Sequence, residues 1–197
     1  MNRWKIQPVV SAALVIINAG IFLICMFGRI SLYVIGGLDV FTVLEKKEYW
    51  RIITSMFLHS GTNHLFSNMI ILFFMGSIIE KEVGHVKYIV LYFLSGIGGN
   101  ILSLLIKVMT NDPSYSVGAS GAVFGLDGAL LAMIFFWHRK LLDATPSRVI
   151  IMILLSVYSG FTTGNIDNAA HIGGLVTGFA IGCVLCLIQS IKYKHTR

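Results

Sequence analysis

The chain has 197 residues, of which 56% are hydrophobic and only 12% charged, and its mean hydropathy is +0.81. A soluble domain carries about 25% charged residues, so this composition excludes an ordinary water-soluble domain and predicts that most of the surface faces lipid. The net charge of +6 would favour nucleic acid as the partner of a soluble protein. In a membrane protein it sets the orientation instead, and we expect no nucleic-acid partner.

Six apolar segments follow one another along the chain, and each is a candidate membrane span. They cover residues 8–28, 63–80, 86–107, 118–137, 148–161 and 169–190. The first lacks a following small-residue cleavage site and is not expected to be a removed signal peptide. The interval between the first two is too mixed in polarity to cross and too apolar for an open linker, so we expect it to fold at the interface, partly embedded. No repeat or second domain is visible, which predicts one membrane domain over residues 1–197 with its core at 50–190.

The basic residues indicate an orientation. With both termini in the cytoplasm, ten of the 15 Lys and Arg residues lie on the cytoplasmic side, in accord with the positive-inside rule. We therefore expect an integral protein of the bacterial cell (inner) membrane with both termini cytoplasmic. The lipid bilayer is then its first partner.

Polar side chains open three of the expected spans at a similar depth, where polar groups are costly. His64 and Asn68 lie four apart on one face of the second span, Ser120 begins the fourth, and His171 lies about one turn into the sixth. A histidine base can turn a serine into a nucleophile. The backbone N–H at a helix start and the side-chain N–H groups of His64 and Asn68 can stabilise an oxyanion. These residues predict an acyl-transfer site.

Glycines predict that the fourth and sixth spans touch. Gly174 and Gly178 form a GxxxG pair beyond His171, and Gly118 lies beside Ser120. Small residues let membrane helices approach closely, as contact between Ser120 and His171 requires. Taken alone, such a pair indicates packing only.

Other interpretations of the same residues stay open from the residues alone. A lone intramembrane serine is usually a packing residue, and a lone histidine suits an interhelical hydrogen bond. A metal held by His64 and His171 would lack a third ligand, so we expect no metal and no cofactor. A small transporter would also carry intramembrane polar residues, but no inverted repeat is visible.

The motifs and their order resemble the rhomboid family of intramembrane serine proteases over residues 50–180. The matching strings are WR at 50–51, HSGTNHLFSN with His59, His64 and Asn68, GSIIEKEVG with Gly76, Glu80 and Gly84, GASG with Ser120, and AHIGGLVTG with His171. The resemblance implies an all-α polytopic membrane protein with six transmembrane helices in a rhomboid-like bundle and a long, partly embedded loop between helices 1 and 2. It also implies a catalytic Ser–His dyad of Ser120 and His171 with no third carboxylate.

The resemblance assigns supporting positions and marks departures. Asn168, three before His171, is expected to shape the outer cavity, and Phe124 stands where many members have tyrosine, so that its ring can stack on His171. Asp167, one turn before His171, allows a triad interpretation that the family pattern does not favour. Asp127, two turns deeper than the nucleophile, lies where members are usually apolar; we expect it to be protonated or bonded to a neighbouring helix.

The expected function is that of an intramembrane serine endopeptidase, a hydrolase that cleaves transmembrane segments of membrane proteins. The oxyanion hole would comprise His64, Asn68 and the N–H of Ser120. A helical substrate must unwind locally, because a helix hides its carbonyls. Water must reach the serine, and His59 and Asn168 are expected to hold it. The alternative is a non-catalytic rhomboid-like protein that binds membrane clients, although such proteins lack the serine or the histidine.

Overall fold

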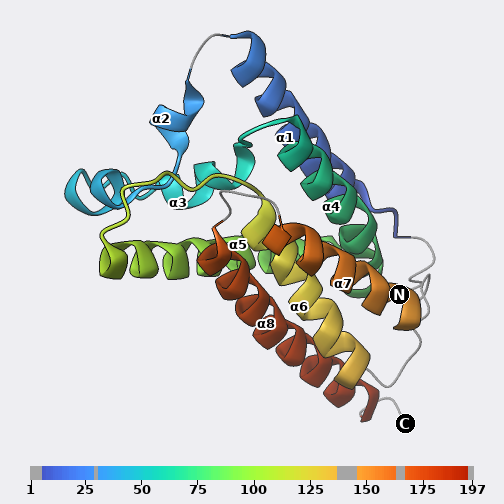
Figure 1. The fold of residues 1–197 in the computed structure, drawn as a ribbon. Coiled ribbons are helices and arrows are strands. Elements are labelled where there is room, and N and C mark those ends of the chain that lie inside the picture. Colours follow the sequence, from blue (N-terminus) through green and yellow to red (C-terminus); the bar gives the residue numbers. More distant parts are fainter. Residues whose placement is uncertain (1–5, 29–30, 137–145, 163–166, 195–197) are drawn as a thin grey trace.

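The computed structural model describes residues 6–28, 31–136, 146–162 and 167–194, and most of them are helical (Figure 1). The long helices are α1 (Val9–Phe27), α4 (Thr62–Val83), α5 (His85–Thr110), α6 (Ser120–Phe136), α7 (Pro146–Thr162) and α8 (Asn168–Lys194). Between α1 and α4 lie four short ones, α2 (Leu32–Gly36), η2 (Phe41–Glu45), α3 (Arg51–Thr54) and η3 (Ser55–Phe57). The pairing of Leu38 with Ser116 is the one strand-like bridge within the described ranges.

The six long helices lie where the sequence predicts spans, with ends that differ by a few residues. Four of them, α1, α4, α5 and α8, are long and apolar enough to cross a membrane. The apolar helix α6 has 17 residues, as has α7, which is the lower end of the range of about 17–25 that a span needs. The protein is thus an all-helical membrane protein with four long apolar helices and a shorter one, and six crossings remain a prediction.

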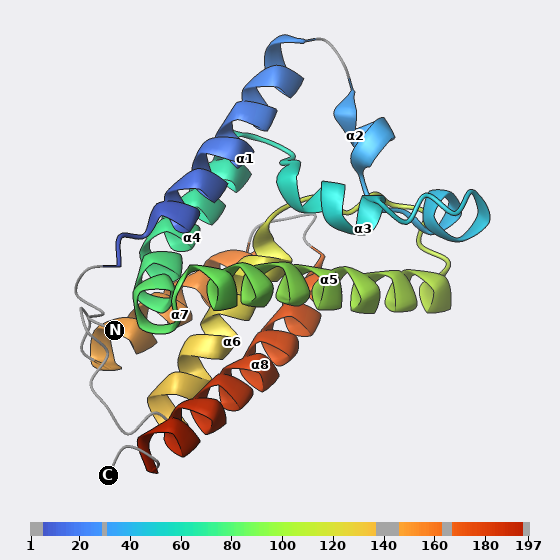
Figure 2. The same cartoon turned by 180° about the vertical axis from the view of Figure 1, so that it is seen from behind.

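The α6 helix forms the centre of the bundle. Its residues 121–130 are all buried, and it packs most extensively against α8, with α5, α4 and α7 around it. Figures 1 and 2 show α5 running across α6 and α8. A Cβ atom added to Gly174 would lie 1.9 Å from the carbonyl oxygen of Gly121. The predicted close contact of the fourth and sixth spans is therefore present, and it brings the two backbones together.

The interval between α1 and α4 packs on the C-terminal half of α5, where Leu38 and Val43 contact Leu104. Arg51 holds it together internally: its guanidinium donates to the carbonyls of Gly37 at 2.8 Å and Val34 at 2.9 Å. Several large apolar side chains of this interval are exposed, namely Val34, Ile35, Phe41, Leu44, Tyr49 and Trp50. Exposed apolar side chains favour a partly embedded loop, which stays a prediction.

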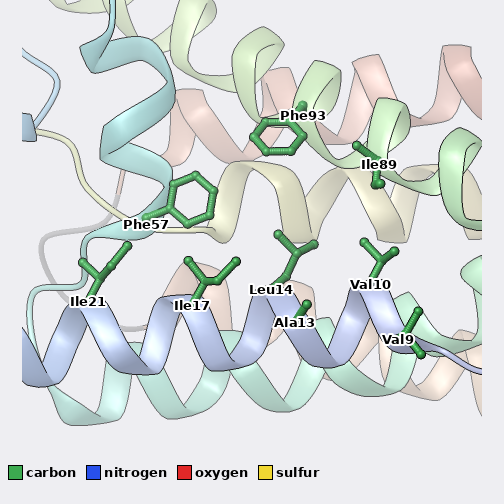
Figure 3. A pocket seen from close by; sticks show the side chains of 9 residues that line it. All are labelled: Val9, Val10, Ala13, Leu14, Ile17, Ile21, Phe57, Ile89 and Phe93. Atoms are coloured by element: carbon green, nitrogen blue, oxygen red, sulfur yellow. The ribbon is translucent and has the colours of Figure 1, made fainter.

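Glu80, near the end of α4, attaches α1 to the bundle. Its carboxylate is fully buried and accepts the backbone N–H groups of Val10 at 2.9 Å and Ser11 at 2.8 Å, together with the Ser11 hydroxyl at 2.7 Å. These N–H groups belong to the first turn of α1, where no intrahelical acceptor exists. An open groove of about 670 Å³, lined on α1 by residues from Val9 to Ile21, lies between α1 and α5 (Figure 3). Its lining side chains, from α1, η3 and α5, are all apolar.

Candidate active site

Ser120 is the first residue of α6, so its N–H belongs to the helix end that lacks intrahelical acceptors. The preceding loop is fixed by Gly118, whose N–H donates to the carbonyl of Ser55 at 2.9 Å. Gly118 has φ +135°, a conformation that favours glycine. A Cβ atom there would also lie 2.7 Å from Cε1 of His64. Glycine is thus required at 118 both by the backbone and by the ring against it.

His64, in the first turn of α4, lies beside Ser120. The position that a Cβ atom of Gly118 would occupy is 2.9 Å from His64 Nε2 and 3.5 Å from Ser120 Oγ. The imidazole nitrogen and the hydroxyl therefore border the same small space above Gly118. The structure brings together two predicted site residues that are more than fifty positions apart in the sequence.

His171, one turn into α8, is buried and faces α6. Its ring stacks on Phe124, with ring centres 4.1 Å apart and planes at 10°, as expected from the sequence. Phe124 lies one turn beyond Ser120 on α6. On the other side of the serine, a Cβ atom of Gly121 would be 3.4 Å from the carbonyl oxygen of Ala170, the neighbour of His171. These contacts place the serine and the histidine at the same level of the α6–α8 contact.

Asn68 and His59 surround His64. The side-chain nitrogen of Asn68 donates to the His64 carbonyl at 2.9 Å, and the same nitrogen carries a second N–H. The His59 ring, in the loop before α4, meets the His64 ring edge-on with centres 5.2 Å apart. Burial lowers the pKa of His59 to about 3, so this ring is neutral. Neither of its nitrogens has a hydrogen-bond partner within the described part of the chain.

Asp167, just before α8, has a role that the sequence did not reveal. One carboxylate oxygen accepts the N–H of Ala170 at 2.9 Å, which caps the helix, and the other accepts the hydroxyls of Ser103 and Ser116. The carboxylate thereby joins α5, the loop before α6 and the start of α8. These three hydrogen bonds give the carboxylate a structural role, and a dyad without a third carboxylate stays a prediction. Asn168, the exposed first residue of α8, lies on the same end of the helix as His171.

The aspartate could have been identified as a cap from the sequence, since Asp directly before an apolar helix is typical of that position. Its two serine partners could not, because they lie on segments more than fifty residues away. Within the described residues no group of three or more His, Cys, Asp and Glu side chains is placed to hold a metal ion. The expectation of no metal stays a prediction.

The arrangement contains the parts that acyl transfer needs: a serine at a helix start, a buried histidine on the facing helix, and N–H donors beside the serine. Each part comes from a different helix, α6, α8 and α4. Their relative placement depends on the glycine contact of α6 with α8 and on the fit of the His64 ring over Gly118.

Comparison with known proteins identifies the family. The Rhomboid domain matches residues 46–188. RHOMBOID-like protein 4 of Arabidopsis thaliana is 41% identical over 159 residues, covering 80% of this chain and 39% of that protein. Rhomboid protease GluP of Bacillus subtilis is 35% identical over 146 residues, covering 74% and 28%. Rhomboid-like protease 1 of Toxoplasma gondii is 38% identical over 144 residues, covering 71% and 48%.

The chain thus spans less than half the length of each of these three relatives. The matched region nevertheless takes in most of the chain, including the start of α4, the α6 helix and the start of α8. Because the Rhomboid domain matches residues 46–188 and RHOMBOID-like protein 4 is 41% identical over 80% of the chain, the chain belongs to the rhomboid family.

Proposed function

We propose that the protein is an intramembrane serine endopeptidase that hydrolyses peptide bonds within transmembrane segments of membrane proteins. The observation that carries this proposal is the convergence of Ser120, His171 and His64 from three helices at one level of the bundle. Two of the related proteins, from Bacillus subtilis and Toxoplasma gondii, are proteases by name.

In this mechanism His171 takes the proton of Ser120 as the serine oxygen bonds to the scissile carbonyl carbon. The negative charge that develops on the carbonyl oxygen is stabilised by N–H groups of Ser120, His64 and Asn68. His171 then gives the proton to the leaving amine, and the peptide bond breaks. Water attacks the acyl-enzyme in the second half of the cycle, with His171 again as base.

The substrate is a transmembrane protein that enters from the bilayer and unwinds near the cut, because a helical segment keeps its carbonyls bonded. The His64 ring lies close against Gly118 and leaves little room there, so a small residue fits best before the scissile bond. His59 holds water near the site, in accord with its buried ring nitrogens, since buried polar groups without protein partners usually bind ordered water.

Labelling with a fluorophosphonate probe tests this function. We expect the wild-type protein in detergent to be labelled and to cleave a transmembrane substrate, whereas Ser120→Ala is neither labelled nor active. His171→Ala should lose cleavage as completely, and the double variant should be no worse than either single one, because the two residues act as a unit.

Retention of full cleavage by either single variant would overturn the dyad. A folded wild-type protein that binds transmembrane peptides but is neither labelled nor active would instead be the non-catalytic client-binding protein. Circular dichroism of each variant shows that the loss does not come from unfolding.

A further inference from the structure

The oxyanion role proposed for His64 depends on which ring nitrogen carries the proton. Nε2 is the nitrogen that borders the space above Gly118 beside Ser120 Oγ. A neutral imidazole has a single N–H, on either Nδ1 or Nε2. With the proton on Nε2 the ring donates toward the reaction centre, and with the proton on Nδ1 it would present a lone pair to the oxyanion and repel it.

The other nitrogen of His64, Nδ1, faces Ser60 in the loop before α4. The backbone N–H of Ser60 points at Nδ1 with an N–N distance of 3.4 Å, and the Ser60 hydroxyl oxygen lies 3.0 Å from the same atom. A backbone N–H can only donate, so Nδ1 is the acceptor. The hydroxyl can donate to the same lone pair, whereas a proton on Nδ1 would oppose the amide.

The other ring near His64 does not compete for this contact. His59 meets His64 edge-on, and its two nitrogens make no hydrogen bond to any residue that the structure describes. The remaining polar contacts of His64 use its backbone carbonyl, which accepts from Ser67 at 3.1 Å and from Asn68 at 2.9 Å. Among the residues that the structure describes, Ser60 is therefore the hydrogen-bond neighbour of Nδ1.

We propose that Ser60 is a positioning residue that keeps His64 in the Nε2-protonated tautomer and so makes its ring an oxyanion donor. The inference rests on the proposed protease function for its catalytic consequence. The tautomer itself is a property of the resting protein. Ser60 lies four residues before His64, so one short segment carries both the donor and the group that orients it.

Nitrogen-15 NMR of the full chain, labelled in its histidine rings and held in lipid nanodiscs, reads the tautomer directly. The His64 signals are assigned by their absence in His64→Gln. At neutral pH we expect an unprotonated Nδ1 and a proton coupled to Nε2. In Ser60→Ala the backbone N–H remains but the hydroxyl is lost, so the Nδ1 resonance should shift toward a tautomer mixture.

Cleavage kinetics supply the second measurement. Ser60→Ala should lower kcat by roughly three- to tenfold, the size of one neutral hydrogen bond, with KM within about twofold. Ser60→Thr keeps a hydroxyl and should restore both kcat and the tautomer signal. Ser67→Ala is the matched control, because it removes a hydroxyl that bonds the backbone of His64 and not its ring; its tautomer and kcat should match the wild type.

A wild-type His64 with its proton on Nδ1 overturns the proposal whatever the activity. So does a Ser60→Ala variant whose tautomer signal and kcat both equal those of the wild type. Failure of the fluorophosphonate to label Ser120 would overturn the protease function instead, and the NMR measurement separates these two failures because it needs no turnover.

Discussion

The contact between α6 and α8 and the contact between α1 and α5 are built in opposite ways. The first joins backbones: a Cβ atom on Gly178 would lie 1.9 Å from the carbonyl oxygen of Gly125. The second joins long apolar side chains across a groove of about 670 Å³ (Figure 3). The candidate nucleophile and base sit on the first contact, and α1 is anchored elsewhere, through Glu80.

The difference shows which helix contact must hold the reacting groups in a fixed position. Misplacement of a reacting group by about 1 Å can cost about 10²-fold in rate, and a contact without side chains between two backbones leaves no freedom for such a shift. A contact made by flexible apolar side chains can adjust when one of them changes. We therefore expect the two contacts to respond very differently to the same substitution.

The largest effect on cleavage and stability is expected from a bulky side chain placed in the α6–α8 contact, compared with the same side chain placed in α1. In Gly178→Leu the new side chain must displace the Gly125 backbone, so we expect loss of cleavage together with a lowered thermal unfolding temperature. Ala13→Leu in α1 is the matched control, because Ala13 lines the open groove of about 670 Å³ between α1 and α5. It should keep wild-type cleavage and stability in detergent. Equal damage from both substitutions would contradict the comparison.

The start of α4 carries the two side chains, His64 and Asn68, that are proposed as oxyanion donors. Removing each donor tests this assignment. His64→Ala should lower kcat by roughly 10²–10³-fold, the size measured for one oxyanion donor elsewhere. Asn68→Ala should lower kcat by an amount at the low end of this range, since one N–H of the Asn68 amide already binds the His64 carbonyl. KM and the unfolding temperature should change little. Wild-type kcat in both variants and in the double variant would remove the oxyanion assignment.

Asp167 joins three segments next to the α6–α8 contact. Its amide variant tests how much that junction contributes to cleavage. In Asp167→Asn one oxygen can still cap Ala170, but the NH2 group cannot accept from Ser103 and Ser116. We expect the cleavage rate of Asp167→Asn to fall about tenfold, as one to two lost hydrogen bonds imply. In Ser116→Ala the cleavage rate should fall by less. A triad aspartate would lose about 10⁴-fold in kcat on the same change, and a loss of that size would restore the triad interpretation.

The sequence predicted the parts of this site that depend on spacing within one helix. The GxxxG pair at Gly174 and Gly178 identified the face of α8 that meets α6, and the four-residue step from Ser120 to Phe124 placed a ring over His171. Such periodicity is set by helix geometry and needs no knowledge of the tertiary structure.

The sequence did not reveal contacts made across distant segments. Ser103 and Ser116 read as ordinary small residues until the fold placed both at the carboxylate of Asp167. Ser60 read as part of a motif string, because its contact depends on how the loop before α4 turns back to the His64 ring. Hydrogen bonds between elements follow from the packing of the whole bundle, which one sequence does not specify at the level of side chains.

Asp127 lies in α6, and its surroundings differ from those of Asp167. It is fully buried in α6, and neither carboxyl oxygen has a hydrogen-bond partner within the part of the chain that the structure describes. Ser156 of α7 lies near enough to interact with the carboxyl group, though outside hydrogen-bond geometry. A hydrogen bond from Asp127 to a neighbouring helix stays a prediction, and α7 is the candidate helix.

The smallest effect on cleavage is expected at this position. Asp127 lies two turns below Ser120 and does not reach the space above Gly118, so Asp127→Leu should keep cleavage within several-fold of the wild type. Leucine replaces an acid whose burial no hydrogen bond from the described residues offsets, and such replacements are often neutral or stabilising. The thermal unfolding temperature should therefore equal or exceed that of the wild type, whereas Asp167→Leu should lower it.

Asp127→Asn separates a neutral acid from a charged one. A protonated carboxyl group and an amide have similar size and no net charge, so this variant should match the wild type in both cleavage and unfolding temperature. A large change in stability would mean that the carboxylate is ionised in the bundle. A loss of cleavage as complete as that of Ser120→Ala, in a protein that stays folded and still binds its transmembrane substrate, would contradict a purely structural role within α6 and would place the aspartate in the catalytic machinery.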